Sequence, residues 1–454
     1  MKNKTNNKQV LFQGFNLSEK LIKSIANMGF IEPTPIQKQS IPLALNGEDI
    51  LASAQTGSGK TAAFAIPIIE NLTDNDAGIA IILTPTRELA NQIYEVFIQL
   101  LGFKNTLKVI SLIGGESITP QLRNLKKKPR IVIGTPGRIN DHINRKSLSI
   151  KKTNILVLDE TDRMLDMGFE IQIEDIVKNM PKKRQTLMFS ATIPPNISKL
   201  AEKYLSNPMR IAIGSVNEIP KNLKQEVLKI KSNEKYDQLL SELKTRKGSV
   251  LVFIKTKYAC DRMAKKLSFD GVKAMGIHGD LKQNKRNRII ADFRNNKFSI
   301  LIGTDIVCRG LDVPHIEHVI NFDLPQVAED FIHRIGRTAR AGQSGSVISF
   351  LTSQDHLKWR AIQKILDPKL KKITTESKNN KNKFKEGNLT EKKLNNKADK
   401  KKKLVLNKKN NTNDFKNKKN RSKKKYKKPM LQKADNRTKF IDEEIVFKII
   451  KEST

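Results

Sequence analysis

Short apolar runs alternate with longer mixed segments through the first half of the chain. Such runs predict buried strands, which fall at residues 50–52, 79–83, 109–113, 131–133, 155–158 and 187–189. Between them apolar residues recur at helical spacing, as at Leu89, Ile93, Phe97 and Leu100. Strands that alternate with helices predict a parallel sheet covered by helices on both faces.

The same pattern starts again after Asn222. Further strands are predicted at residues 227–230, 250–254, 274–277, 300–302, 319–320 and 347–350. We therefore predict two similar α/β domains, at residues 1–210 and 223–367. Proline and glycine interrupt the pattern between them, which predicts a linker at residues 211–222.

Residues 368–454 differ in composition from the rest of the chain. Lys and Asn dominate, as at residues 379–383 and 400–403, and apolar residues are scarce. Such a segment cannot bury enough surface to offset the entropy of ordering, so we predict a disordered basic tail. Residues 440–450 are more apolar and form either a short docking element or a frayed end.

The charge of the chain narrows the range of partners. Lys and Arg number 85 against 46 Asp and Glu, a formal net charge of +39 that favours nucleic acid or an anionic membrane surface. No apolar run reaches the roughly 20 residues that span a bilayer, and the polar N-terminus precedes no signal-peptide core. We expect a cytoplasmic protein with no membrane partner, in which Cys260 and Cys308 are reduced structural side chains.

The first chemical motif follows the first predicted strand. Its residues are Ala54, Gln55, Thr56, Gly57, Ser58, Gly59, Lys60 and Thr61. Glycines let backbone N–H groups approach phosphate oxygens, and the N-terminus of the following helix adds positive potential. Lys60 is predicted to reach the β- and γ-phosphates of ATP, and Thr61 to coordinate Mg²⁺. The alternative is a glycine-rich turn without nucleotide, and Ala54 replaces the usual first glycine.

A second motif places Asp159 and Glu160 at the end of the predicted strand 155–158. Such strand ends are where parallel sheets bind ligands. One carboxylate, Asp159, is predicted to hold Mg²⁺, directly or through water, and Glu160 to polarise the attacking water. The alternative is an exposed acidic turn.

A third motif contains Arg337 and Arg340, which share a face if this segment is a helix. They can then point together at a γ-phosphate from the second domain, as an arginine finger does. The alternative is a solvated basic helix face.

Together these motifs resemble the DEAD-box RNA helicases of helicase superfamily 2, over about residues 12–352. The resemblance implies two tandem RecA-like domains. Residues 29–30 and 33–37 resemble the Q motif, placed at residues 10–38. By this resemblance Gln37 contacts the adenine edge and Phe12 stacks on the ring, with Phe15 a weaker candidate.

The resemblance also implies further site residues. In the segment 309–312, Asp312 holds the ribose. Coupling of hydrolysis to strand separation falls to Ser190, Ala191, Thr192, Asp162 and His333. RNA contacts fall to residues 283–286 and 304–305 and to Pro85, Thr86, Arg87, Gly115, Thr135, Pro136, Gly137, Arg138, Arg286 and Thr304.

The sequence departs from the family pattern at three positions. Thr161 stands where Ala is usual, which leaves the catalytic acids intact but adds bulk near Ser190 and His333. Cys308 and Ala339 replace the common Ala and Gly. Within the family, residues 164–169 and 189–194 resemble bacterial RhlE-like members.

The expected function is an ATP-dependent RNA helicase that closes on ATP, Mg²⁺ and single-stranded RNA. It unwinds short duplexes locally or remodels RNA–protein complexes, and it contacts mainly the RNA backbone. We expect a monomer that acts in ribosome assembly or RNA decay. The alternatives are a non-enzymatic RNA clamp, a DNA translocase and a membrane-associated basic protein.

Overall fold

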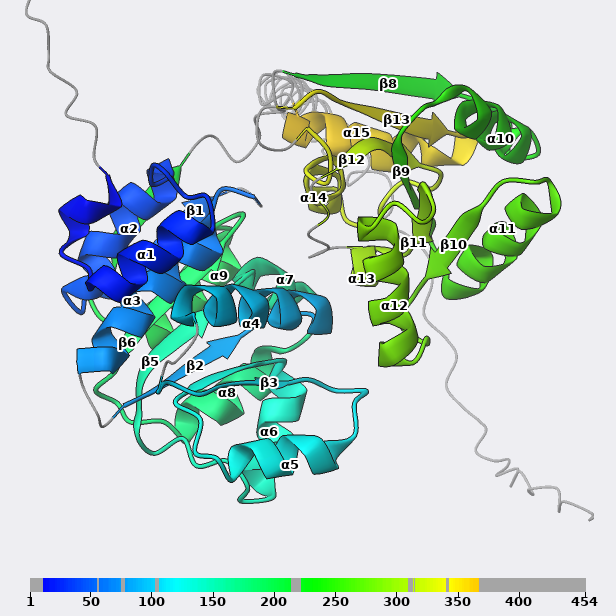
Figure 1. The fold of residues 1–454 in the computed structure, drawn as a ribbon. Coiled ribbons are helices and arrows are strands. Elements are labelled where there is room, and N and C mark those ends of the chain that lie inside the picture. The colour runs from blue at the N-terminus through cyan, green and yellow to red at the C-terminus, as the bar shows by residue number, and fades with distance from the viewer. Residues whose placement is uncertain are drawn as a thin grey trace, which may run out of the picture. The chain divides into compact units, whose positions relative to one another are not determined.

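The computed structural model describes residues 11–54, 57–74, 78–102, 106–213, 222–308, 313, 315–339 and 343–366. These residues form two parallel β-sheets covered by helices, which confirms the predicted α/β fold class (Figure 1). The tail at residues 368–454, with its segment 440–450, lies outside the described residues.

The first sheet has seven strands in the order β3-β4-β2-β5-β6-β1-β7. Its strand pairs are parallel. The strands are β1 (Ile50–Ala54), β2 (Ile79–Leu83), β3 (Val109–Leu112), β4 (Ile131–Gly134), β5 (Thr153–Leu158), β6 (Gln185–Ser190) and β7 (Met209–Ile213).

Alternate residues of these strands enter two separate cores, because successive side chains of a strand point to opposite faces. On one face Ala52 and Val157 pack against η1 (Phe12–Phe15), α1 (Glu19–Asn27), α2 (Pro35–Leu45), α3 (Lys60–Asp74) and α4 (Arg87–Leu101). On the other face Leu51 and Leu156 pack against α5 (Ile118–Leu125), α6 (Pro136–Asn144), α7 (Thr161–Asp166), α8 (Glu170–Lys178) and α9 (Pro195–Tyr204).

The second sheet has six parallel strands in the order β10-β11-β9-β12-β13-β8. They are β8 (Leu223–Lys229), β9 (Ser249–Phe253), β10 (Ala274–Ile277), β11 (Ile300–Gly303), β12 (Ile316–Asn321) and β13 (Gly345–Leu351). One face packs against α10 (Lys235–Thr245) and α11 (Lys257–Phe269). The other packs against α12 (Gln283–Arg294), α13 (Asp305–Cys308), α14 (Glu329–Ile335) and α15 (His356–Leu366), which follows η2 (Ser353–Asp355).

Strand β7 is the one element of the first sheet that the hydrophobic pattern missed. It pairs with β1 at the sheet edge, and only Ile211 of its five residues is fully buried. An edge strand needs fewer apolar residues, so its sequence resembles a loop. The strand runs to Ile213, into the segment predicted as linker, whose residues 214–221 lie outside the described ranges.

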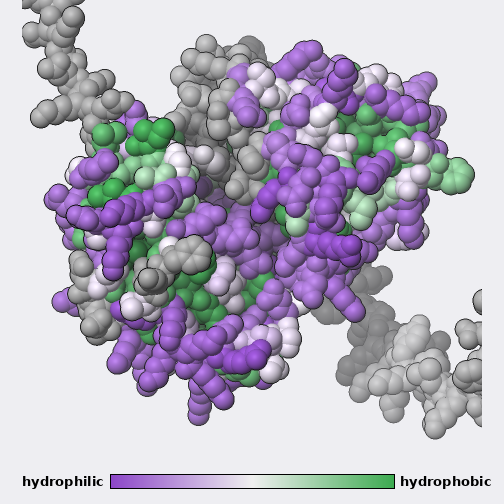
Figure 2. Space-filling model, in the orientation of Figure 1, coloured by the Kyte–Doolittle hydropathy of each residue, from purple (hydrophilic) through white to green (hydrophobic). Residues whose placement is uncertain are grey.

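Hydrophilic residues cover most of the visible face of the described chain, with smaller apolar areas between them (Figure 2). Its exposed large apolar side chains include Ile31, Ile171, Phe269 and Leu357. Single exposed apolar residues are ordinary on protein surfaces. Among the described helices, none has both the length and the apolar character that crossing a bilayer requires.

Candidate nucleotide and RNA site

The phosphate loop joins β1 to α3. Gly57 and Gly59 have φ angles of +82° and +93°, a region that favours glycine, and α3 begins at Lys60. The side chain of Lys60 is buried and donates from Nζ to the carbonyl oxygen of Ala54 at 2.8 Å. Ser58 Oγ is buried without a hydrogen-bond partner among the described residues. A buried cation, an orphaned hydroxyl and a helix N-terminus suit a phosphate group; Gln55 and Thr56 lie outside the described residues.

Gln37 contacts this loop directly. Its Nε2 donates to the carbonyl oxygen of Gly59 at 3.1 Å, while Oε1 accepts from Thr34 N at 2.9 Å in the capping box of α2. A Cβ at Gly59 would lie 2.5 Å from Gln37 Nε2, so a side chain there would displace the amide. Phe12 is buried, with its ring edge-on to Phe15 at a centroid distance of 6.0 Å. Gln37 is thus built into the phosphate-loop structure.

Asp159 and Glu160 follow the buried strand β5 at the same edge of the sheet as the phosphate loop. Asp159 is buried, and burial raises its pKa to about 6; Lys60 opposes this rise and Glu160 adds to it. A carboxylate whose ionisation is this costly would be stabilised by a bound cation.

Glu160 has a left-handed φ of +48° at the N-cap of α7. Its burial opposes ionisation, but Arg163, Arg337 and His333 outweigh that cost and hold its pKa below the usual range. Glu160 is therefore an ionised base with cations from both sheets nearby.

Arg163 was not among the predicted site residues. Its Nη1 lies 3.6 Å from Glu160 Oε2, and its Nη2 donates to the carbonyl oxygen of Asp305 at 3.2 Å. The guanidinium is almost fully buried. Its spacing of three residues from Glu160 on a short helix was the available signal.

Four of the predicted coupling residues, those of the first sheet, lie together. Asp162 Oδ2 accepts hydrogen bonds from Ala191 N at 3.1 Å, Thr192 N at 2.9 Å and Thr192 Oγ1 at 3.1 Å. Ser190 Oγ donates to the carbonyl oxygen of Thr192 at 2.6 Å.

Thr161 adds a link, because its buried hydroxyl lies 3.1 Å from the carbonyl oxygen of Phe189 near the end of β6. It also lies 3.1 Å from the carbonyl oxygen of Leu158.

The arginine motif differs from the helix that the spacing suggested. Helix α14 ends at Ile335, so Arg337 lies in the turn after it and donates from Nε to the carbonyl oxygen of His333 at 3.1 Å. The condition under which the two arginines would share a helix face therefore fails at Arg337. Arg340 and Asp312 lie outside the described residues.

Two helix starts carry the predicted RNA residues of the first sheet. Thr86 follows Pro85 and caps α4 by accepting from Leu89 N at 3.3 Å. Arg87 lies against the backbone of Gly115, where a Cβ would be 1.9 Å from its Nη1. Thr135, Pro136, Gly137 and Arg138 form the start of α6, with Thr135 as N-cap.

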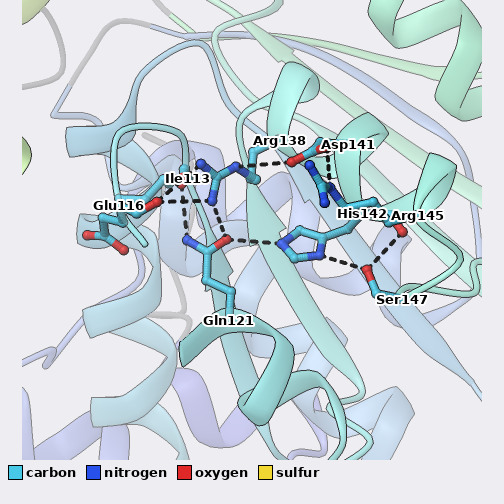
Figure 3. A network of polar contacts seen from close by, with 8 residues as sticks. All are labelled: Ile113, Glu116, Gln121, Arg138, Asp141, His142, Arg145 and Ser147. Atoms are coloured by element: carbon cyan, nitrogen blue, oxygen red, sulfur yellow. Dashed lines mark hydrogen bonds and ion pairs between the residues drawn. The ribbon is translucent and has the colours of Figure 1, made fainter. Parts of the chain in front are cut away.

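Arg138 is held by a polar network that the sequence did not reveal (Figure 3). Its Nη1 donates to Gln121 Oε1 at 2.8 Å, and Gln121 Oε1 also lies 3.0 Å from His142 Nε2. Ser147 Oγ lies 2.8 Å from His142 Nδ1. The network extends from the partly exposed guanidinium into the buried side of α5 and α6.

In the second sheet, Arg286 and Thr304 are buried. Arg286 Nη2 lies 2.5 Å from Glu88 Oε1, which also accepts from Gln283 Nε2 at 3.0 Å. Arg87 Nη1 donates to Gln283 Oε1 at 3.3 Å. Glu88, which stands in the segment 85–89 that resembles the family's RNA contacts, therefore links residues predicted to contact RNA from both sheets.

The two cysteines are buried free thiols, as predicted. Burial raises the pKa of Cys260 to about 12, so this thiol is un-ionised at neutral pH and unsuited to act as a nucleophile.

Comparison with known proteins agrees with this geometry. Residues 34–200 match the DEAD/DEAH box helicase family and residues 231–342 match the helicase conserved C-terminal domain. The DEAD-box ATP-dependent RNA helicase CshA of Bacillus subtilis is 42% identical over 366 residues, covering 80% of this chain and 74% of that protein. The ATP-dependent RNA helicase CshA of Listeria monocytogenes is 43% identical over 346 residues, covering 76% and 66% respectively.

Solved structures show the same architecture. Dbp5 of S. cerevisiae, bound to RNA and ADP BeF3, matches with a TM-score of 0.72 and 32% identity over 78% of this chain and 93% of that chain. Mss116p, bound to ssRNA and AMP-PNP, matches with a TM-score of 0.73 and 29% identity over 79% and 78%.

The chain belongs to the DEAD-box ATP-dependent RNA helicases. It is an ATP-hydrolysing enzyme with the two-domain RecA-like core, and RNA is its partner. The finer likeness to RhlE-like members stays a prediction.

Proposed function

We propose that the residues around Glu160 form one ATP-hydrolysing site shared by the two sheets. Lys60 binds the β- and γ-phosphates, Glu160 polarises the attacking water, and Arg337 with Arg340 stabilises the charge that develops on the transferred phosphoryl group. The observation that carries this assignment is the position of Arg163, whose Nη1 lies 3.6 Å from Glu160 Oε2 and whose Nη2 donates to the carbonyl oxygen of Asp305 in the second domain at 3.2 Å. An arginine of the second sheet helps to keep a buried carboxylate of the first sheet ionised.

Thr61 and Asp159 would hold Mg²⁺. The burial that raises the pKa of Asp159 supports this placement, because a cation would offset the cost of its ionisation. When bound, Mg²⁺ neutralises phosphate charge. Gln37 contributes in two ways, by contacting adenine, on which Phe12 stacks, and by holding Gly59 of the phosphate loop. Asp312 holds the ribose.

RNA binds along the helix starts and loops named above, through Thr86, Arg87, Gly115 and residues 135–138 in the first domain. Arg286 and Thr304 contribute from the second. These are backbone, hydroxyl and guanidinium groups, which suit phosphate and 2′-OH recognition and read little sequence. ATP and RNA then favour the same closed state and bind cooperatively. The Asp162 contacts to Ala191 and Thr192 connect hydrolysis to strand separation.

The experiment is phosphate release measured with RNA and with DNA of one sequence, for the parent protein and for Glu160→Gln. We expect stimulation by RNA and little by DNA, and loss of turnover in Glu160→Gln with RNA binding retained. Equal stimulation by DNA would indicate a DNA translocase instead. Unchanged turnover in Glu160→Gln would remove Glu160 from the reaction.

The basic tail at residues 368–454 is proposed to tether the enzyme to structured RNA. Each neutralised phosphate adds a salt slope of roughly −0.9 for duplex or −0.7 for single strands. Truncation after Asp367 should raise the RNA concentration for half-maximal ATPase and leave the saturated rate similar. Collapse of the saturated rate would place the tail in the catalytic unit. A cytoplasmic monomer acting in ribosome assembly or RNA decay fits this role and is proposed with it.

A further inference from the structure

Two buried side chains next to Arg138 have no part in the function proposed so far. Gln121, on α5, and His142, one turn along α6 from Arg138, are 4% and 0% exposed. The side chain of Arg138 is 14% exposed and reaches the surface. Figure 3 shows Gln121 between Arg138 and His142, with Ser147 at the far end of the chain of contacts.

We propose that Gln121 and His142 are positioning residues that hold the Arg138 guanidinium for an RNA phosphate. This inference rests on the proposed contact between Arg138 and RNA. The contact then depends on two buried side chains, Gln121 from α5 and His142 from α6, which we call the relay.

The orientation of the Gln121 amide is fixed by its partners. Its Nε2 donates to the carbonyl oxygen of Ile113 at 3.0 Å, so its Oε1 must face Arg138 Nη1 and His142 Nε2. An oxygen with two lone pairs accepts two hydrogen bonds. His142 therefore carries its hydrogen on Nε2, and its Nδ1 faces the Ser147 hydroxyl at 2.8 Å; that hydroxyl has one hydrogen and a second acceptor, the carbonyl oxygen of His142 at 3.0 Å. Arg138 and His142 thus both donate to Gln121 Oε1, from opposite ends of the relay.

The relay decides where the guanidinium points. Gln121 Oε1 takes one N–H of Arg138, and the carbonyl oxygen of Glu116 lies 3.4 Å from Nη1 and 3.3 Å from Nη2. Two of the five guanidinium N–H groups then have no hydrogen-bond acceptor within the described chain, and these can meet a phosphate. Asp141 Oδ2 lies 3.8 Å from Nε and is the competing anion. Without the Gln121 acceptor, we expect the guanidinium to turn towards Asp141.

The test uses one shape-matched substitution on each helix and one that keeps the donor. Gln121→Leu removes the acceptor, and His142→Phe removes the donor that fixes it. His142→Gln keeps an N–H near the Nε2 position. Asn140→Ala is the matched control, because Asn140 lies on α6 and bonds to the carbonyl oxygen of Gln172 at 2.9 Å, outside the relay. The readouts are the RNA concentration for half-maximal ATPase and the saturated rate.

We expect Gln121→Leu and His142→Phe to raise the half-maximal RNA concentration about tenfold, the effect of one charged hydrogen bond, with saturated turnover within about twofold. His142→Gln and Asn140→Ala should match the parent. Added to Arg138→Ala, neither substitution should weaken RNA binding further. If Gln121→Leu and His142→Phe bind RNA as the parent does while Arg138→Ala binds it weakly, the proposed role of Gln121 and His142 is wrong and the Arg138 contact stands. If Arg138→Ala itself binds normally, the proposed contact fails first.

One measurement needs no substitution. The ¹⁵N shifts of the His142 ring in the full chain should show hydrogen on Nε2 and none on Nδ1 at neutral pH. The opposite tautomer would overturn the relay, because Gln121 Oε1 would then face an acceptor.

Discussion

Gln37 donates from Nε2 to the carbonyl oxygen of Gly59 at 3.1 Å and so joins the predicted adenine-binding motif to the phosphate loop. If Gln37 only contacted the base, its loss would matter only for ligands that carry one. If Gln37 also holds the phosphate loop, its loss should weaken binding of a ligand that has phosphates but no base.

Gln37→Leu should therefore weaken binding of both ATP and inorganic triphosphate, by about tenfold, because it removes a buried hydrogen bond to the loop. Equilibrium competition against a fluorescent nucleotide measures both ligands. Gln39→Ala, an exposed position on the same helix, is the control. Normal triphosphate binding by Gln37→Leu would limit Gln37 to the base.

Gly115 has no room for a side chain, and Gly137 does. Gly115 has a φ of +76° and Arg87 packed against it, whereas a Cβ at Gly137 meets nothing within 4 Å. Gly115→Ala should displace Arg87 and cost about 1–2 kcal/mol in backbone strain. RNA titrations should show weakened binding for Gly115→Ala and normal binding for Gly137→Ala. If both bind equally well, the Arg87 position seen here does not matter for RNA.

Thr161 shares its one hydroxyl hydrogen between two strands, since its Oγ1 lies 3.1 Å from the carbonyl oxygens of both Leu158 and Phe189. Thr161→Val keeps the shape, removes the donor, and should lower the free energy of unfolding by about 1–2 kcal/mol. Thr161→Ser keeps the hydroxyl, so its free energy of unfolding should fall less than that of Thr161→Val. ATP turnover should survive in both, because Asp159 and Glu160 are unchanged. Urea unfolding measures the difference. If Thr161→Val and Thr161→Ser lose the same free energy of unfolding, the hydroxyl does not contribute to stability.

The His142 ring should make stability depend on pH. Burial first, and then repulsion from Arg138, lowers its pKa below the usual 6.5, and Arg145 adds to this while Asp141 opposes it. Since the unfolded chain binds the proton more readily, this stabilisation is complete above about pH 6.5 and is lost as pH falls through the folded pKa. The free energy of unfolding should fall less between pH 7.5 and pH 5 in His142→Gln than in the parent. An identical fall in both proteins would contradict it.

Periodicity and local motifs predicted much of this molecule. Buried parallel strands are continuous apolar runs, so their positions, the two α/β domains and the phosphate loop could be inferred from the sequence. The three-residue spacing of Arg337 and Arg340 left open whether they share a helix, and α14 ends at Ile335, before Arg337.

The contacts that orient the site could not be inferred in the same way. Glu88 meets Arg286 across 198 residues of sequence, and Gln121 reaches His142 from another helix. Such pairings depend on tertiary packing, which leaves no local spacing to read. Arg163 is the exception, because it stands three residues after Glu160 and could have been proposed from the sequence.

The most direct test concerns the claim that both domains complete one ATP site. RNA-stimulated ATP hydrolysis should be measured for Lys60→Ala from the first sheet and Arg337→Ala from the second, with the exposed Arg288→Ala as control. Each of the first two should lose turnover at saturating RNA by about 10³-fold or more, the range expected for an arginine finger, while the control matches the parent. Parental rates in both Lys60→Ala and Arg337→Ala would contradict the account.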